Sequence, residues 1–187
     1  MKNIIEKFRE KESLSLENEA LFLCSLKRIE CEAKTILQEA GKIADKIYFL
    51  ERGLARTYNY KDGRDITYWI STGNDFIGAV ASYYMREPSY KYVETLEDSV
   101  LWEFNYHLLE PIFNKNKELG NLARFFTNFG MSLIIKRFDG LHVYTAKERY
   151  DLLIKENPEI LQRVPLGIIA SFLGVTQETL SRIRAQK

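Results

Sequence analysis

Near the C-terminal end of the chain, several polar side chains have types that match the hydrogen-bonding groups of nucleic acids. Arg182 can donate two hydrogen bonds to guanine O6 and N7, Glu178 can accept one from cytosine N4, and Gln177 suits adenine. Thr176 and Ser181 carry hydroxyl groups that suit phosphate oxygens. We therefore expect Arg182 and Glu178 to read bases, with Gln177 as a further contact.

The spacing of these charges also allows a simpler interpretation. Glu178 and Arg182 are four residues apart, so they can form an exposed ion pair on one helix. Both interpretations can hold in the free protein. Arg184 is expected to add affinity for every DNA sequence rather than for one base pair.

The elements that must position these side chains are two short helices across a tight turn. Packing such helices dictates which positions are apolar or small. Those positions are filled by Ile169, Ala170, Leu173, Val175, Leu180 and Ile183. Gly174 permits a left-handed turn, Thr176 can cap the second helix, and Pro165 suits the start of the first. This agreement predicts a helix-turn-helix; the alternative is an ordinary helical hairpin.

Length and composition indicate a globular protein with one large domain or two small ones. The chain has 187 residues, of which 45% are hydrophobic and 13% aromatic, enough to bury a core. The formal net charge of +1 gives no hint of a nucleic-acid partner. The segment Arg163–Lys187, however, holds four basic residues against one acidic residue, a local charge of +3. That is a modest charge for attracting phosphates.

Catalytic and metal-binding constellations are not predicted. His107 and His142 lie far apart, and Cys24 and Cys31 are too few for a structural zinc or iron–sulfur site made of cysteines. We expect no enzyme, no metal and no cofactor, although an unknown small-molecule effector is compatible with the sequence. The absence of a long apolar stretch and the early charges at the N-terminus predict a cytoplasmic protein with no membrane partner.

Short strands are expected in the middle of the chain, after a helical region that covers the first 28 residues. The strands are predicted at residues 46–50, 54–60, 66–70, 91–96 and 100–104. Asp62-Gly63 can supply the positive φ angles of a tight hairpin turn. Many short strands at even spacing indicate a sandwich or a barrel.

After Pro111, apolar residues that recur three and four positions apart predict a long helix. They are Leu119, Leu122, Phe126, Phe129 and Leu133. So much apolar surface on a helix between two domains favours dimerisation through it; the alternative is that it packs back on the β-domain. With a hinge at Asp139-Gly140, we divide the chain into residues 1–110 (β-domain with N-terminal helices), 111–140 (dimerisation helix) and 141–187 (helix-turn-helix domain).

This order of elements resembles the Crp/Fnr family of bacterial transcription regulators over almost the whole chain. Residues 46–54 are similar to the family's strand–turn–strand that ends in glycine, and residues 73–78 to its Gly-Asp-x-x-Gly segment, with Asn74 inserted. Residues 174–183 are similar to its recognition helix. The resemblance implies an α+β fold: an N-terminal jelly-roll β-barrel of the cyclic-nucleotide-binding type, a long dimerisation helix and a C-terminal helix-turn-helix.

The resemblance also implies which residues meet DNA, namely those at Gln177, Glu178 and Arg182. We therefore expect a homodimeric transcription regulator that binds an inverted-repeat operator with half-sites about 34 Å apart, one turn of the duplex. RNA polymerase would be a further partner of an activator. The chain stops four residues after Ile183, so we expect no β-hairpin wing and a greater dependence on dimeric avidity.

The candidate effector pocket departs from the family pattern. Family members that bind cyclic nucleotide have a glutamate directly after the glycine that matches Gly78, where this chain has Ala79. Their Arg-Ser pair falls at about Ser89-Tyr90, with Lys91 as the nearby cation. Without a bidentate arginine, a bound phosphate loses its strongest hydrogen bonds. We expect that cyclic AMP does not bind tightly, and that Gly78, Ala79, Tyr90 and Lys91 border a pocket for some other ligand.

Two functions of other classes stay open at this point. The first is a small-molecule sensor or protein-interaction module that has lost DNA binding. The second is an enzyme that uses the barrel as a scaffold for a metal. The segment Cys31–Phe104 contains no histidine, which makes the second function the weaker alternative.

Overall fold

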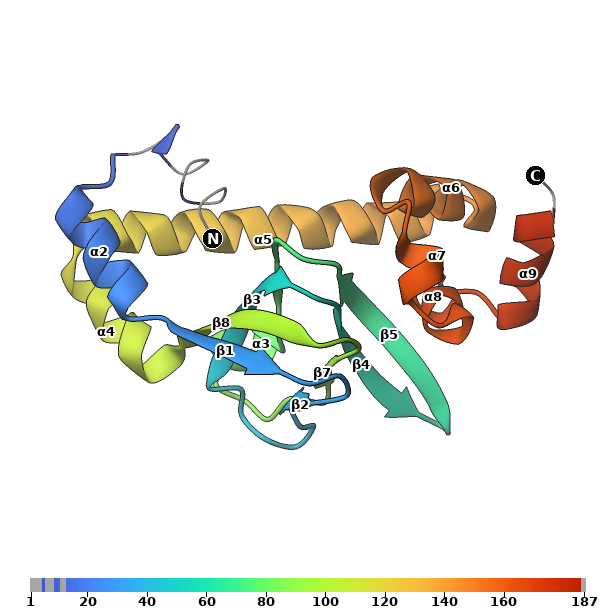
Figure 1. The fold of residues 1–187 in the computed structure, drawn as a ribbon, viewed down its shortest axis with the longest axis horizontal. Helices are drawn as coiled ribbons and strands as arrows, with labels where there is room; N and C mark the ends of the chain where they lie inside the picture. Colours follow the sequence, from blue (N-terminus) through green and yellow to red (C-terminus); the bar gives the residue numbers. More distant parts are fainter. Residues whose placement is uncertain (1–4, 6–8, 11–12, 186–187) are drawn as a thin grey trace.

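The strands form two four-stranded antiparallel sheets that face each other (Figure 1). The computed structural model describes residues 5, 9–10 and 13–185. One sheet has the order β1 (Lys27–Cys31), β8 (Ser99–Asn105), β3 (Lys46–Arg52) and β6 (Asp75–Ile77). The other has the order β2 (Ile36–Gln38), β7 (Tyr92–Thr95), β4 (Ala55–Lys61) and β5 (Arg64–Ser71). The expected α+β jelly-roll fold is confirmed, as an open sandwich rather than a closed barrel.

An apolar core joins the two sheets, because alternate residues of a strand point to the same face. Tyr48, Leu50 and Leu101 come from the first sheet. Ala55 and Val93 come from the second sheet. All five are buried, so the sandwich has an interior of its own.

The hairpin between β4 and β5 turns at Asp62-Gly63, as predicted. Asp62 has a φ of 52° and Gly63 a φ of 72°, and these positive angles match the twist of the two strands. The tip of the hairpin extends beyond the other strands on the side of the molecule that carries the C-terminal helices (Figure 1), and β5 contacts α8. Strand β5 is the edge strand of its sheet, so one side of its backbone is available to another element.

Helices pack against the sandwich on one side and at one end. They are α2 (Leu16–Cys24), α3 (Val80–Met85), α4 (Tyr106–Lys115) and α5 (Lys117–Val143). Helix α5 runs from its contact with α4 at one end of the molecule to the C-terminal helices at the other (Figure 1). It is therefore the element that connects the sandwich to the helix-turn-helix.

The apolar stripe predicted on α5 faces its own subunit. Leu119 and Leu122 are fully buried and Phe126 is 9% exposed, all in a core shared with the sandwich. Phe129 packs against this core, and Leu133 is partly buried. Leu119, Leu122 and Phe126 are thus used within the subunit, which is the alternative that the sequence left open for this face. The physical reason is that the sandwich offers apolar surface to the helix within the same chain.

Two element boundaries also differ from the expectation. Lys27 and Arg28, expected at the end of a helical region, begin strand β1, which pairs with β8. Asp139-Gly140 forms no hinge, because both residues lie inside α5, which continues to Val143. A glycine inside a helix costs only about 1 kcal/mol, which packing of a long helix offsets.

Four further helices follow in the described part of the chain: α6 (Ala146–Glu156), α7 (Ile160–Arg163), α8 (Leu166–Leu173) and α9 (Gln177–Ala185). Helix α6 begins with a capping box formed by Thr145 and Glu148. The apolar sides of these helices share a core with Leu54 and Ile70 of the sandwich. Within the described part of the chain, no helix is long and apolar enough to span a bilayer.

Candidate nucleic-acid interface and effector pocket

Helices α8 and α9 meet across the turn that the sequence predicts. Gly174 ends α8 with a φ of 69°, a left-handed conformation that glycine adopts without strain. The Val175 N–H donates to the Ala170 carbonyl over 3.0 Å. Thr176 Oγ1 accepts a hydrogen bond from the Thr179 N–H over 3.1 Å, which confirms Thr176 as the cap of α9.

The two faces of α9 have opposite character. Leu180 and Ile183 are buried in the core shared with α8, as the helix-turn-helix pattern predicts. The outward face carries the residues predicted to contact DNA, and all of them are exposed: Thr176, Gln177, Glu178, Ser181, Arg182 and Arg184. In Figure 1, α9 lies on the outer side of α8, away from the sandwich. A ligand can therefore approach this face.

Arg182 and Glu178 form an ion pair on α9. Their side chains are 72% and 74% exposed, respectively, so water competes with the pair and it contributes little to stability. The simpler interpretation of the spacing thus describes the free protein. Because the pair is exposed, it can open at little cost.

Arg163 has a different role from the one that its charge suggested. It donates to the two carboxylate oxygens of Glu97 over 3.0 and 2.7 Å, and to the Gly53 carbonyl over 2.9 Å. Hydrogen bonding to Glu97 raises the pKa of Arg163 above its usual value. One cation of the local count is therefore used to hold α7 on the sandwich. Lys187, another cation of that count, lies outside the described residues.

The residues assigned to the effector pocket lie around α3 but differ in accessibility. Ala79 is 3% exposed and belongs to the core. A Cβ atom at Gly78 would lie 2.7 Å from a side-chain carbon of Ile47, so this position needs glycine. Ala79, Tyr90 and Lys91 all border a cavity of about 120 Å³. Ligand pockets usually have volumes of about 300–1,000 Å³, so this cavity is small for a nucleotide.

Lys91 is engaged by aromatic rings at this cavity. Its Nζ lies 4.2 Å from the ring centroid of Tyr68 and 5.2 Å from that of Tyr90, within the range of cation–π attraction. Ser89 is engaged too, because its Oγ accepts from the Lys91 N–H over 2.9 Å and donates to the Lys91 carbonyl over 3.0 Å. The polar groups at the position of the family's Arg-Ser pair thus have partners within the chain.

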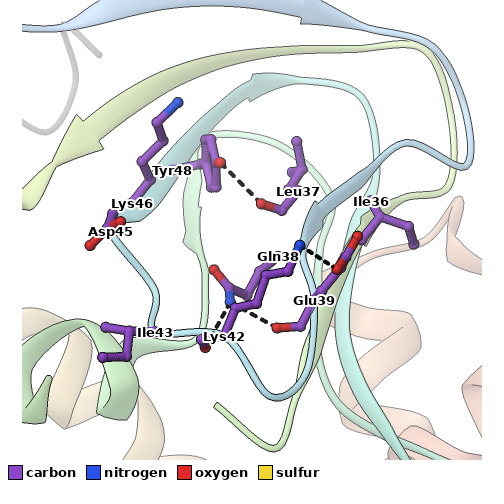
Figure 2. Close-up of a pocket in the computed structure, with 9 residues that line it drawn as sticks. All are labelled: Ile36, Leu37, Gln38, Glu39, Lys42, Ile43, Asp45, Lys46 and Tyr48. Atoms are coloured by element: carbon purple, nitrogen blue, oxygen red, sulfur yellow. Dashed lines mark hydrogen bonds and ion pairs between the residues drawn. The ribbon is translucent and has the colours of Figure 1, made fainter. Parts of the chain in front are cut away.

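A larger hollow, which the sequence did not predict, lies between β2 and the start of β3 (Figure 2). Its volume is about 260 Å³. The Gln38 amide donates to the carbonyls of Glu39 and Lys42 across it, and Tyr48 Oη donates to the Leu37 carbonyl over 3.2 Å. Burial raises the pKa of Tyr48 above its ordinary value. These polar groups satisfy one another, and no sequence motif marks the hollow.

Comparison with known proteins places the sandwich in a recognised family. Residues 28–116 match the family described as "Cyclic nucleotide-binding domain". The chain is also 25% identical, over 166 residues, to an "Anaerobic regulatory protein" of Pasteurella multocida (strain Pm70). This match covers 81% of the chain and 60% of the relative, so it spans less than two thirds of that protein's length.

Solved structures share the fold over most of this chain. FixK2 from Bradyrhizobium japonicum matches with a TM-score of 0.72 and 17% identity over 86% of this chain and 83% of that one. A transcriptional regulator of the Crp/Fnr family from Thermus thermophilus matches with a TM-score of 0.63 and 17% identity, over 86% and 84% of the two chains. These likenesses establish the fold. With its sandwich, its long helix and its helix-turn-helix, the chain is similar in fold to the Crp/Fnr family regulator from Thermus thermophilus, and its sandwich matches the cyclic nucleotide-binding domain.

Proposed function

We propose that the protein is a sequence-specific DNA-binding transcription regulator that acts as a homodimer. The observation that carries this proposal is the outward face of α9, where polar side chains of types that can bind base edges are exposed while the opposite face is fixed in a core. The similarity to proteins described as an anaerobic regulatory protein and as a transcriptional regulator supports a regulatory role. The protein would not be an enzyme.

Each subunit would place α9 in a major groove. Arg182 and Glu178 would read base edges, with Gln177 as a further base contact. The hydroxyl groups of Thr176 and Ser181, which lie on the same exposed face, would contact phosphates. Arg184 would add attraction to the backbone at any sequence.

A second copy of the chain would pack on the exposed side of α5. The C-terminal part of this helix carries an apolar stripe in which each residue is between 40% and 60% exposed: Met131, Ile134, Ile135, Phe138 and Leu141. Met131, Ile134, Phe138 and Leu141 follow one another at intervals of three and four residues, which is the spacing of a coiled-coil seam, and Ile135 lies beside Ile134. A two-fold dimer through this stripe would present two α9 helices to an inverted repeat with half-sites about 34 Å apart.

Cyclic AMP would not control this regulator. The cavity beside α3 is small, and Ala79 and the Ser89–Lys91 pair leave no bidentate partner for a cyclic phosphate. A ligand at 100 times its Kd stabilises the folded state by about 2.7 kcal/mol. We therefore expect 1 mM cyclic AMP to leave the melting temperature unchanged, whereas a clear rise would contradict this part of the proposal.

The test of the function is selection of bound duplexes from a randomised DNA pool at about 150 mM salt. We expect a palindrome with half-sites one turn apart. The variant Gln177→Ala/Glu178→Ala/Arg182→Ala should select nothing, and Lys147→Ala, which removes an exposed cation of α6, should select the same palindrome. If the wild-type protein enriches no sequence and its residual binding fades with salt, the chain is a sensor or an interaction module.

The proposal has two corollaries for cellular context. A regulator of this kind acts where the chromosome is, so we place the protein in the cytoplasm of a bacterial cell. If it activates transcription, RNA polymerase is its further partner. A reporter gene downstream of the selected palindrome would distinguish activation from repression.

A further inference from the structure

The structure assigns to Arg137 and Ser171 a role as positioning residues for DNA recognition. We propose that they fix α8 to strand β5, and that they thereby set the direction in which α9 projects from the subunit. The inference rests on the proposed function, because it concerns how the reading helix is presented to DNA. It adds that the orientation of this helix is built into the chain.

Arg137 joins three elements at one point. It lies on α5, its Nε donates to the Tyr68 carbonyl of β5 over 3.1 Å, and its Nη2 donates to the Phe172 carbonyl of α8. The guanidinium also lies over the Phe172 ring, 3.6 Å from the centroid. A single planar side chain on the long helix α5 thus contacts both strand β5 and helix α8, the first helix of the helix-turn-helix.

This arginine is placed at an energetic cost. Burial, with a smaller contribution from the charge of Arg149, lowers the pKa of Arg137 to about 10. Among the described contacts, its hydrogen bonds go to backbone carbonyls and not to a carboxylate. The last carbonyls of a helix carry partial negative charge, which favours a cation there. An apolar side chain would fill this space without the desolvation cost, so the two carbonyl bonds are what the arginine specifically provides.

Ser171 makes the second attachment of α8. Its Oγ accepts from the Thr67 N–H over 2.8 Å and donates to the Asp65 carbonyl over 2.9 Å. Both backbone groups belong to the free side of the edge strand β5. The Ser171 hydroxyl therefore binds backbone groups of β5 that a further strand could otherwise pair with.

The attachments lie directly before the turn that leads into α9. Arg149 of α6 donates to the Leu173 carbonyl over 3.0 Å, next to the carbonyl that Arg137 binds. Gly174 follows at once and begins the turn. Because the end of α8 is held from two sides, a displacement of α8 on β5 would change the direction of α9.

The docked arrangement does not block the DNA-facing side of the reader. The attachments use α8, while Gln177, Glu178 and Arg182 on α9 stay exposed. The attachment of α8 to β5 therefore fixes the orientation of α9 and leaves its outward side chains accessible. In a dimer, the two α9 helices would then lie at one fixed distance from each other. The protein should therefore bind only operators whose half-sites have the matching spacing.

The test compares the selected palindrome with a copy that has one base pair inserted between the half-sites. We expect the wild type to bind the inserted copy at least tenfold more weakly. Arg137→Met and Ser171→Ala should reduce this ratio to threefold or less, since a loosened reader accommodates both spacings. The control Lys136→Ala, a neighbouring exposed residue of α5, should keep the wild-type ratio. Arg137→Lys, which can still donate to a carbonyl, should recover part of it.

A merely structural role would lower affinity for both duplexes equally and leave the ratio unchanged, and that result would overturn the inference. Hydrogen–deuterium exchange provides a readout without DNA: Ser171→Ala should accelerate exchange at the Thr67 amide, and unchanged exchange would contradict the docking. If the wild type selects no DNA at all, the proposed function fails and the positioning role with it. A wild type that selects a palindrome with a loose spacing overturns the positioning role alone.

Discussion

Arg56 on β4 donates to Glu94 on the neighbouring strand β7 over 2.6 Å, although Arg56 is only 5% exposed. The same guanidinium donates to Asp65 of β5 over 2.8 Å and lies 3.9 Å from the ring centroid of Tyr58. Three adjacent strands of one sheet are therefore joined by one buried cation. Removing one partner from such a pair leaves an uncompensated buried charge.

Arg56→Met should consequently destabilise the fold by about 3 kcal/mol, because Glu94, whose side chain is only 13% exposed, would lose its counter-charge. Denaturant unfolding monitored by circular dichroism measures this free energy. Arg64→Met makes the same substitution at an exposed position of the hairpin and should change stability by less than about 0.5 kcal/mol. Equal effects of the two substitutions would contradict a structural role for the Arg56 ion pairs.

Asp75 should make the folded state less stable as pH rises, whereas a carboxylate in a salt bridge makes it more stable as pH rises. Burial raises the pKa of Asp75, in spite of hydrogen bonds from the Trp69 indole and the Phe76 N–H. The folded state then binds this proton more tightly than the unfolded state. The contribution of protonated Asp75 to the stability of the fold is complete below the unfolded-state pKa of this carboxyl, about 3.9. It is lost as pH rises through the higher folded-state pKa.

Asp75→Asn removes this titration, so the unfolding free energy of the wild type relative to the variant should be larger at pH 4 than at pH 7. Urea titrations of both proteins at the two pH values measure the difference. A constant difference, or a larger one at pH 7, would show that the pKa of Asp75 is not raised.

Local patterns in the sequence predicted those elements that depend on few neighbours. Gly174 and Asp62-Gly63 mark turns because their positive φ angles are a local requirement. The burial of Leu180 and Ile183 follows from helical periodicity alone. For this reason the helix-turn-helix and its exposed polar face could be predicted in detail.

Contacts between distant segments could not be predicted in the same way. Periodicity showed that Leu119 and Phe126 share a face, but not whether the sandwich or a second copy covers it. Arg163 was counted as a free cation because its partner, Glu97, is far away in the sequence. The role of Arg137 also depends on backbone carbonyl groups of two other elements. Every residue has such a group, so the sequence does not indicate which ones Arg137 binds.

Dimerisation should depend on the exposed stripe of α5 rather than on the stripe buried against the sandwich. Ile135→Glu places a charge in the proposed seam, and the two-fold axis brings two such charges together. We expect the dimer dissociation constant to rise at least tenfold, which corresponds to about 1.4 kcal/mol. Analytical ultracentrifugation measures it. Lys117→Glu, an exposed charge change at the other end of α5, should leave the dimer intact, and an unchanged dimer of Ile135→Glu would exclude this seam.

Arg182 and Arg184 should differ in how their loss affects DNA binding, although both are exposed arginines of α9. Arg182→Ala should cost about 1–3 kcal/mol on the selected palindrome and relax specificity at one base pair, since a base contact is lost. Arg184→Ala should weaken binding to all sequences about equally and reduce the salt dependence, since a phosphate contact is lost. Fluorescence anisotropy with operators substituted one base pair at a time separates these patterns. A uniform loss from Arg182→Ala would assign this arginine to the backbone and leave Glu178 and Gln177 as the base readers.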